Sequence, residues 1–287
     1  DPRVEDELNH ALSFGIRFSF EQYVNYRPVK LYPNVPTVLR DSDKKSIDMV
    51  ILRENTEGAY ANIGGRFKTG TPDEVGTQTA IITRKGSERL MRYGFELTRR
   101  RRDGGKTDSH ITCCTKGNVL KFGMRTWDDT FTMLQEEYAD VKSEFRYVDS
   151  MGMWLVKNPE MFDVICCSNL FGDIMTDISA LLQGGLGFAA SGSINPERKY
   201  PSGFESMHGS APKYKGLNVI NPMATILTVK IMLEHLGEFE AANLLDAALT
   251  ELFGEKAIMT RDMGGSMKTS EVGDVICDRL CKLTKLN

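Results

Sequence analysis

The 287-residue sequence has no apolar run approaching the ~20 residues that a membrane-spanning helix needs, and no charged-then-apolar leader. It also lacks a strong excess of either charge, because 36 Lys and Arg stand against 39 Asp and Glu, which gives a net charge of -3 and a pI of 5.9. Such a balance produces no field that would attract nucleic acid or an anionic membrane. We therefore expect neither partner and favour small-molecule chemistry.

One basic run, 99–102, is the exception to this balance. It follows a stretch of helical character, 87–98, and precedes Asp103, Gly104 and Gly105. It is interpreted either as an RNA-binding patch or as the end of a helix. No aromatic residue interleaves the run, whereas cations complement the dipole at a helix C-terminus and glycine ends a helix. We favour the helix end.

Cysteine is too sparse and too clustered for a disulfide framework or a zinc site built from paired C-x-x-C units. The six cysteines are Cys113, Cys114, Cys166, Cys167, Cys277 and Cys281. The two adjacent pairs lie in apolar runs that are typical of buried strands, which favours a role as small core residues over redox chemistry. This usage predicts a reducing, cytoplasmic location.

Strand-like and helix-like segments alternate along the chain. Apolar runs at 29–32, 47–52, 109–115 and 162–168 predict strands, and 87–98, 127–138, 222–236 and 238–253 predict helices. This alternation indicates an α/β protein that contains parallel strands. The glycine clusters at 184–187 and 264–265 do not spell G-x-G-x-x-G, so a nucleotide would have to be held by another kind of loop.

A carboxylate pair, Asp173 and Asp177, follows the predicted strand 162–168. The residues 169–172 are expected to turn into a helix that begins near Asp173. A spacing of four places both carboxylates on one helix face, where they repel unless a cation or a proton lies between them. Oxygen ligands of this kind suit Mg²⁺ or Mn²⁺, but acidic residues also favour the first turn of a helix. Spacing alone leaves both interpretations open.

Several polar residues form the rest of the candidate site. Arg17, Arg27 and Arg53 are individually typical of surface charges, yet together they would clamp a substrate with two carboxylates, because a guanidinium pairs bidentately with a carboxylate. Tyr60 and Lys116 are typical of a half-buried tyrosine and a strand-end lysine. Near a metal and cationic side chains, either would also serve to move protons.

A loop of small and turn-forming residues, 204–214, precedes the predicted helix at 222 and contains His208. A plain surface loop with a solvated histidine is one interpretation. Its density of hydroxyl, imidazole and backbone donors is equally consistent with a ligand loop.

These residues resemble the β-decarboxylating dehydrogenase family, which includes isocitrate, isopropylmalate, homoisocitrate and tartrate/D-malate dehydrogenases. The resemblance runs from about residue 11 to 280. The matching positions, in family order, are Arg17, Arg27, RENTEGAY (53–60), TKGN (115–118), YVDSM (147–151), NLFGDIMTD (169–177) and HGSAP (208–212). The fold implied is isopropylmalate/isocitrate dehydrogenase-like, with a discontinuous large domain, a small domain and an active-site cleft between them.

Position by position, the resemblance implies that Arg17, Arg27 and Arg53 bind the substrate carboxylates. It implies that Lys116 is the general base and that Tyr60 is the acid that later protonates the enol. The reaction would be the NAD(P)-linked oxidation of a small 2-hydroxy dicarboxylic acid, usually with decarboxylation.

The resemblance also implies a site shared between subunits. Asp149, Asp173 and Asp177 would surround Mg²⁺ or Mn²⁺, with Asp149 and the base Lys116 supplied by the neighbouring subunit. Because a monomer would not assemble this site, we expect a homodimer.

Cofactor binding is implied for a further set of positions. They are Asn118, Glu205, His208, Gly209, Ser210, Ala211, Lys213, Tyr214 and Asn221. Lys213 and Tyr214 resemble the residues that face the 2′-phosphate in NADP-using isocitrate dehydrogenases, which favours NADP over NAD.

Within the family, 63–66 and 194–202 are most similar to the tartrate/D-malate branch, with isocitrate and isopropylmalate as the alternative substrates. We expect a large, cofactor-binding domain at 1–22 and 185–287 that lacks its usual N-terminal part, and a small domain with the dimer interface at 23–184. The absent N-terminal part favours an incomplete sequence over a true deletion. It also leaves a rival interpretation, a non-catalytic subunit that supports a partner enzyme.

Overall fold

The computed structural model of the protein describes residues 14–40 and 46–284. The strands are β1 (Val24–Lys30), β2 (Asp48–Glu54), β3 (Gly58–Phe67), β4 (Val75–Ile81), β5 (Ile111–Thr115), β6 (Ser143–Tyr147), β7 (Val164–Cys167), β8 (Ala190–Ile194) and β9 (Gly203–Ser206). The α-helices are α2 (Gly15–Ser19), α3 (Arg84–Asp103), α4 (Gly123–Glu137), α5 (Val148–Lys157), α6 (Asn169–Leu182), α7 (Met223–Leu236), α8 (Phe239–Gly254) and α9 (Thr269–Thr284). Short 3₁₀ turns lie at Pro159–Met161, Leu186–Phe188, Pro212–Tyr214 and Arg261–Met263.

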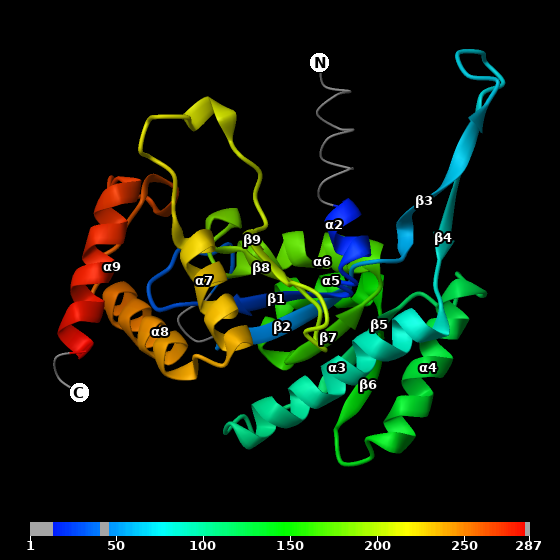
Figure 1. Ribbon diagram of the computed structural model, residues 1–287, viewed down its shortest axis with the longest axis horizontal. Helices are drawn as coiled ribbons and strands as arrows, with labels where there is room; N and C mark the ends of the chain where they lie inside the picture. Colours follow the sequence, from blue (N-terminus) through cyan, green and yellow to red (C-terminus); the bar gives the residue numbers. More distant parts are fainter. Residues whose placement is uncertain (1–13, 41–45, 285–287) are drawn as a thin grey trace.

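One mixed sheet runs through the molecule in the order β6-β5-β7-β2-β1-β8-β9 (Figure 1). The pairs β6 with β5, β5 with β7, and β7 with β2 are parallel. From β2 onward the direction alternates, because β1 is antiparallel to both β2 and β8, and β8 is antiparallel to β9. The predicted α/β class with parallel strands is therefore confirmed, and the sheet adds an antiparallel half.

The parallel half of the sheet is covered by helices on both faces. Helices α3 and α4 pack on the face that carries Cys113 and Cys166, whereas α5 and α6 pack on the face that carries Cys114 and Cys167. Successive strand residues point to opposite faces, so each adjacent cysteine pair places one small thiol in each layer. All four thiols are buried and free, which confirms their predicted role in the core.

Helix α3 contains the basic run. The Thr83 side chain caps its start by accepting a hydrogen bond from the Gly86 amide at 2.9 Å, and the helix ends at Gly104. Its last turn carries Arg100, Arg101 and Arg102. The prediction of a helix end is confirmed, and the structure extends the helix three residues before and five residues after the expected range of 87–98.

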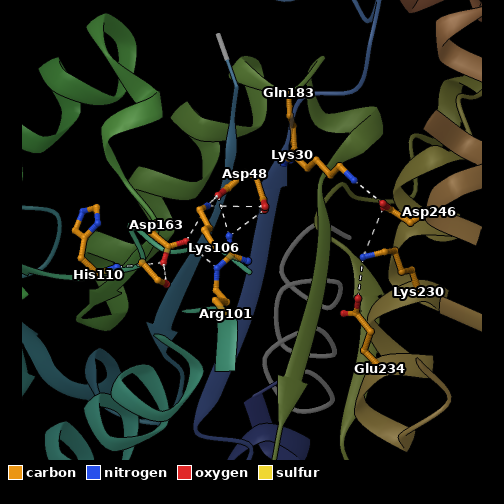
Figure 2. Close-up of polar contacts among 11 residues, drawn as sticks. Lys30, Asp48, Arg101, Lys106, His110, Asp163, Gln183, Lys230, Glu234 and Asp246 are labelled. Carbon is orange, nitrogen blue, oxygen red and sulfur yellow. Dashed lines mark hydrogen bonds and ion pairs between the residues drawn. The ribbon is translucent and has the colours of Figure 1, made fainter. Parts of the chain in front are cut away.

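Two groups of ion pairs connect the helices to the sheet near the neighbouring ends of β1 and β2 (Figure 2). On one side, Asp163 accepts from Arg101 Nε at 2.7 Å and lies 2.8 Å from Lys106 Nζ, which ties the end of α3 to the sheet. Burial alone would raise the pKa of the Asp163 carboxyl, but Arg101 and Lys106 outweigh it and hold the pKa below its ordinary value.

On the other side, Asp246 of α8 joins β1 to the C-terminal helices. It accepts from Lys30 Nζ at 2.5 Å, and Lys230 of α7 pairs with Glu234 at 2.8 Å (Figure 2). Asp246 also accepts from the Tyr32 hydroxyl at 2.7 Å. A separate apolar core built from α7, α8 and α9 lies against this edge. The antiparallel half of the sheet is thus anchored by charge as well as by packing.

Several elements differ from the sequence expectation. The strand expected at 29–32 is β1, which begins at Val24 and ends at Lys30, and Phe204 to Ser206 of the expected loop belong to β9. Strands β3 and β4 form a two-stranded hairpin that projects from the body of the molecule, and their mostly exposed side chains gave no core pattern to detect (Figure 1). The expected division at 22/23 and 184/185 stays a prediction, and part of it, residues 1–13, lies outside the described residues.

Among residues 14–40 and 46–284, no helix combines the length and the apolar character that crossing a membrane would require.

Because α3 contacts the sheet closely, replacing a glycine by alanine should have opposite effects on stability in α3 and in α9. A Cβ on Gly94 would lie 2.6 Å from Cys166 Sγ and 2.9 Å from Ile111 Cδ1, both buried, whereas a Cβ on Gly273 in α9 would meet nothing within 4 Å. We expect Gly273→Ala to raise the free energy of unfolding by about 0.5–1 kcal/mol through helix propensity. We expect Gly94→Ala to lower it by about 1–3 kcal/mol through overpacking. Urea titrations of both variants measure this, and a stabilised Gly94→Ala protein would contradict the packing described.

The Asp163 cluster predicts a stability that depends on pH. Because its folded-state pKa is depressed, the carboxylate contributes stability above the unfolded-state value of 3.8, and this contribution is lost as the pH falls through the folded-state value. Asp163→Asn should therefore cost about 3–5 kcal/mol at pH 7 by unpairing buried charge, and the cost should shrink towards pH 3. Asp48 contacts the same two cations but is 53% exposed, so Asp48→Asn should cost less than about 1 kcal/mol. A pH-independent cost for Asp163→Asn in urea titrations would refute this.

Candidate active site

Helix α6 begins earlier than the sequence suggested. Its first residue is Asn169, directly after the Ser168 cap, so the expectation of a start near Asp173 is wrong. The first turn contains no acidic residue, and Asp173 and Asp177 lie in the second and third turns. A preference of acids for the first turn of a helix therefore does not explain the pair.

The register of β1 against β2 places Arg27 and Arg53 on the same face of the sheet. Arg27 lies opposite Ile51, and Arg53 follows Ile51 by two residues. Both arginines are buried, with 7% and 3% of their surface exposed, and both face α6. Burial and their mutual repulsion lower the pKa of Arg27 to about 10, and burial likewise lowers the pKa of Arg53.

Arg53 is held along its whole guanidinium edge. Its Nε donates to the Asn169 carbonyl at 3.0 Å, and its Nη2 donates to Asn169 Oδ1 at 2.8 Å. Its Nη1 pairs with Asp173 Oδ1 at 2.5 Å. Asn169 is itself fixed by donating through Nδ2 to the Glu57 carbonyl at 3.0 Å.

This contact requires glycine at position 172. A Cβ there would lie 2.6 Å from Cβ and Cγ of Arg53 and 3.1 Å from its Cα. Gly172 therefore allows α6 to lie directly on β2 at the point where Arg53 leaves the strand.

Tyr60 completes this cluster from the base of the hairpin. Its hydroxyl donates to Asp173 Oδ2 at 2.7 Å, its ring lies under the Arg53 guanidinium at 5.1 Å, and it stacks on Phe14 at 5.8 Å. Burial, together with the hydrogen bond to Asp173, raises the pKa of Tyr60. Its hydroxyl therefore keeps its proton at neutral pH and is available as an acid.

Arg17, the third predicted arginine, lies in α2. Its Nη2 lies 3.2 Å from Glu205 Oε1 of β9, a residue that the sequence assigned to cofactor binding. The side chain of Arg17 is 16% exposed and that of Glu205 is 60% exposed. The predicted substrate and cofactor regions thus meet at this ion pair.

Lys116 and Asp149 form a separate pair. Lys116 Nζ lies 2.8 Å from Asp149 Oδ2, and this hydrogen bond lowers the pKa of the Asp149 carboxyl. Lys116 follows β5 in a turn fixed by the Gly117 amide, which donates to Thr115 Oγ1 at 3.0 Å. Within the described ranges, no hydrogen bond or ion pair links this pair to Arg27, Arg53, Tyr60 or Asp173.

The three predicted metal ligands do not converge within one chain. Over residues 14–40 and 46–284, no group of three or more His, Cys, Asp or Glu side chains is placed to hold a metal ion. Asp177 is exposed and Asp149 is exposed, and Asp173 already serves Arg53 and Tyr60. The donor chemistry of Asp173 and Asp177 on α6 suits a hard divalent cation, whereas Asp149 lies on α5 and pairs with Lys116.

The remaining predicted cofactor residues follow β9 or lie near Lys116. Those from His208 to Tyr214 lie on one loop that ends in a 3₁₀ turn, with Ala211 in the left-handed region at φ 45° and Lys213 Nζ 4.8 Å from the Tyr214 ring centre. Asn221 is buried, donates to Asp262 at 2.9 Å and accepts from the Met223 amide at 3.0 Å, which fixes the start of α7. Asn118 is exposed in the turn after Lys116.

Two contact residues were missed by the sequence reasoning. Asn169 holds Arg53, and Thr176 accepts a short hydrogen bond from Arg27 Nη1. Both were visible as polar residues seven apart on the helix that carries the acidic pair. Their role depends on which face of α6 meets β1 and β2. That face was not predicted, because the helix was expected to begin near Asp173 and not at Asn169.

Over residues 6–276 the sequence matches the isocitrate/isopropylmalate dehydrogenase family. It is 42% identical over 283 residues to a protein named 3-isopropylmalate dehydrogenase from Thermobifida fusca, covering 98% of this chain and 77% of that one. It is 44% identical over 274 residues to a probable tartrate dehydrogenase/decarboxylase from Bacillus subtilis, covering 95% and 74%.

The fold is similar to that of solved structures. The isocitrate dehydrogenase from Methylococcus capsulatus superposes with a TM-score of 0.85 at 32% identity, covering 94% of this chain and 77% of that chain. A structure from Thermus thermophilus gives a TM-score of 0.83 at 38% identity, covering 93% of this chain and 52% of that chain. The chain therefore spans about three quarters of the curated relatives and about half of the Thermus chain.

Asparagine variants of the two acids on α6 are expected to differ in their free energy of unfolding but to be alike in having a weaker affinity for metal. Asp173 offsets two buried arginines but is 39% exposed, so Asp173→Asn should lower the free energy of unfolding by about 1–2 kcal/mol after allowance for solvent screening. Asp177 makes no hydrogen bond or ion pair with any other described residue, so Asp177→Asn should change it by less than about 0.5 kcal/mol.

Urea titrations with a metal chelator measure these stabilities, and calorimetric titration with Mn²⁺ measures metal affinity. Both variants should bind Mn²⁺ more weakly than the parent protein. Equal stability of the two variants would argue against the Asp173 contacts described.

Proposed function

The chain belongs to the isocitrate/isopropylmalate dehydrogenase family and is a dehydrogenase that acts on a CH–OH group with decarboxylation, and we propose that its substrate is a small 2-hydroxy dicarboxylic acid of the tartrate/D-malate type. The alternative substrates are isocitrate and 3-isopropylmalate. The observation that carries the proposal is the buried pair Arg27 and Arg53 beside Asp173.

Within the described residues Arg53 pairs with Asp173, whereas Arg27 has no ion-pair partner and is acted on by Asp173 and Asp177 only from farther away, which leaves an excess of positive charge at its guanidinium. Such an excess suits an anionic ligand, and two guanidiniums suit one with two carboxylates. Arg17 supplies a third cation at the α2 side, and its exposed partner Glu205 is a weak competitor for it. A small diacid satisfies this arrangement.

The proton-transfer roles follow from the charges of the side chains. Lys116 is proposed to accept the proton of the substrate hydroxyl, because it is the amine that lies beside the predicted metal ligand Asp149. Tyr60 returns a proton to carbon after CO₂ leaves, because its raised pKa keeps its hydroxyl protonated until then.

Asp173 and Asp177, with Asp149 from a second copy, would hold Mg²⁺ or Mn²⁺. When bound, the metal supplies polarisation of the substrate oxygen, and a bound nicotinamide supplies the hydride acceptor. Removing a divalent metal from the assay should therefore abolish turnover.

A second copy of the chain is proposed to complete the site. Helices α5 and α6 lie against each other, since a Cβ on Gly152 would be 3.7 Å from Met175 Cε. They expose apolar side chains beside the predicted metal ligands, namely Met153, Val156, Leu170, Ile174 and Leu181. An exposed apolar face of this kind favours a protein interface, and it lies on the helices that carry Asp149, Asp173 and Asp177.

The substrate and cofactor preferences rest on finer features. The residues 63–66 on β3 and 194–202 after β8 support the tartrate/D-malate type, and relatives of both names match at similar identity. Lys213 and Tyr214 lie together on the exposed loop and support NADP over NAD. We also propose a cytoplasmic location, which rests on the cysteine usage. We propose a division into two domains, at 1–22 with 185–287 and at 23–184, which rests on the family resemblance.

An assay panel tests the proposal. The protein is incubated with D-malate, tartrate, isocitrate or 3-isopropylmalate, with Mn²⁺ or Mg²⁺, and with NAD⁺ or NADP⁺, while cofactor reduction and CO₂ release are followed. We expect the highest kcat/KM with D-malate or tartrate and NADP⁺. Arg53→Leu should lower it by at least about a hundredfold, because a charged hydrogen-bond pair to the substrate is lost.

Faster turnover of isocitrate or 3-isopropylmalate would reverse the substrate preference. No turnover of any of the four would favour the rival function, a non-catalytic subunit that supports a partner enzyme.

A further inference from the structure

We infer that Asn169 and Thr176 are positioning residues that orient the substrate-binding arginines. One face of α6 then both orients these arginines and carries the acidic pair. The inference rests on the proposed function of Arg27 and Arg53. It assigns to both side chains a role that requires no contact with the substrate or with the reacting atoms.

Asn169 fixes Arg53 from three sides. Its backbone carbonyl and its Oδ1 both accept from Arg53 Nε, at 3.0 and 3.1 Å, and Oδ1 also accepts from Nη2 at 2.8 Å. Nη1 of Arg53 donates in addition to Asp173, and these hydrogen bonds together fix the orientation of the guanidinium plane. The amide of Asn169 is locked in turn by the Glu57 carbonyl.

Thr176 is the corresponding contact for Arg27. Its side chain is buried, and its hydroxyl accepts from Arg27 Nη1 while it lies 2.8 Å from the Gly172 carbonyl and 3.0 Å from the Asp173 carbonyl. A hydroxyl has one proton and two lone pairs, so it donates to a helix carbonyl and still accepts from the arginine. Across residues 14–40 and 46–284 this is the one hydrogen bond made by the Arg27 guanidinium, and its buried Nε has no partner there.

The helical period brings these residues together with the acids. Asn169, Asp173, Thr176 and Asp177 are spaced by four, three and one residues, which places them on one side of a helix. A rigid element therefore fixes the distance between the arginines and the predicted metal ligands. Precise placement of this kind contributes to rate without any contact with the substrate.

The test compares Thr176→Val, which keeps the shape and removes the hydroxyl, with Thr176→Ser, which keeps the hydroxyl. For the preferred diacid we expect Thr176→Val to raise KM about tenfold, because Arg27 loses the hydrogen bond that fixes its guanidinium, while KM for NADP⁺ changes less than about twofold. Thr176→Ser should stay within about twofold of the parent protein for both.

A background variant separates positioning from general structure. When Arg27→Met has removed the guanidinium, adding Thr176→Val should change kcat/KM by less than about twofold, because residues that act through one another are not additive. An undiminished loss in that background, an unchanged KM in Thr176→Val, or an equal loss in Thr176→Ser would each overturn the inference.

If Thr176→Val does not yield folded protein, Asn169→Ala carries the test on Arg53 and should show the same rise in KM for the diacid alone. A wild-type level of KM in that variant would overturn the inference. A parent protein that turns over none of the diacids would contradict the proposed function itself. The inference, which rests on that function, would then be wrong as well.

Discussion

The candidate site is organised around the burial of two like-charged guanidiniums, Arg27 and Arg53, beside the carboxylate of Asp173. Desolvating two cations at one place is unfavourable, and burial lowers the pKa of both arginines, with Arg53 lowering that of Arg27 further. The surrounding elements reduce that cost with a carboxylate, an amide and a hydroxyl, all supplied by α6. The positive charge that remains is the feature that an anionic substrate would satisfy.

The fold brings this cluster together from distant parts of the chain. Antiparallel pairing of β1 with β2 places the two arginines on one face, and the parallel pairing of β2 with β7 places the start of α6 directly after the neighbouring strand. Gly172 lets the helix approach β2 at Arg53. The Lys116 and Asp149 pair belongs to β5 and α5, one step farther along the sheet, which separates the proposed base from the proposed clamp.

The sequence predicted the α/β class, the helix end at the basic run and the buried cysteines, because these depend on local periodicity and composition. It also selected Arg53, Tyr60 and Asp173, which the structure brings into contact, and Arg27, which lies on the same face of the sheet as Arg53. It did not predict the antiparallel half of the sheet, because the pairing of β1 with β8 joins residues far apart in the chain. Thr176 was missed because its contact with Arg27 depends on which face of α6 meets the sheet, and the start of that helix was misplaced.

We propose that each active site is assembled from two chains, one supplying Arg27, Arg53, Tyr60 and Asp173 and the other supplying Lys116 and Asp149. Subunit complementation tests it most directly. Lys116→Ala and Asp173→Asn proteins, each inactive alone, are unfolded, mixed in equal amounts and refolded, and the activity of the mixture is measured. Random pairing predicts recovery of about a quarter of the activity of parent protein treated in the same way, because half of the dimers contain one intact site of two. A mixture that stays inactive while the treated parent protein recovers would contradict the shared site.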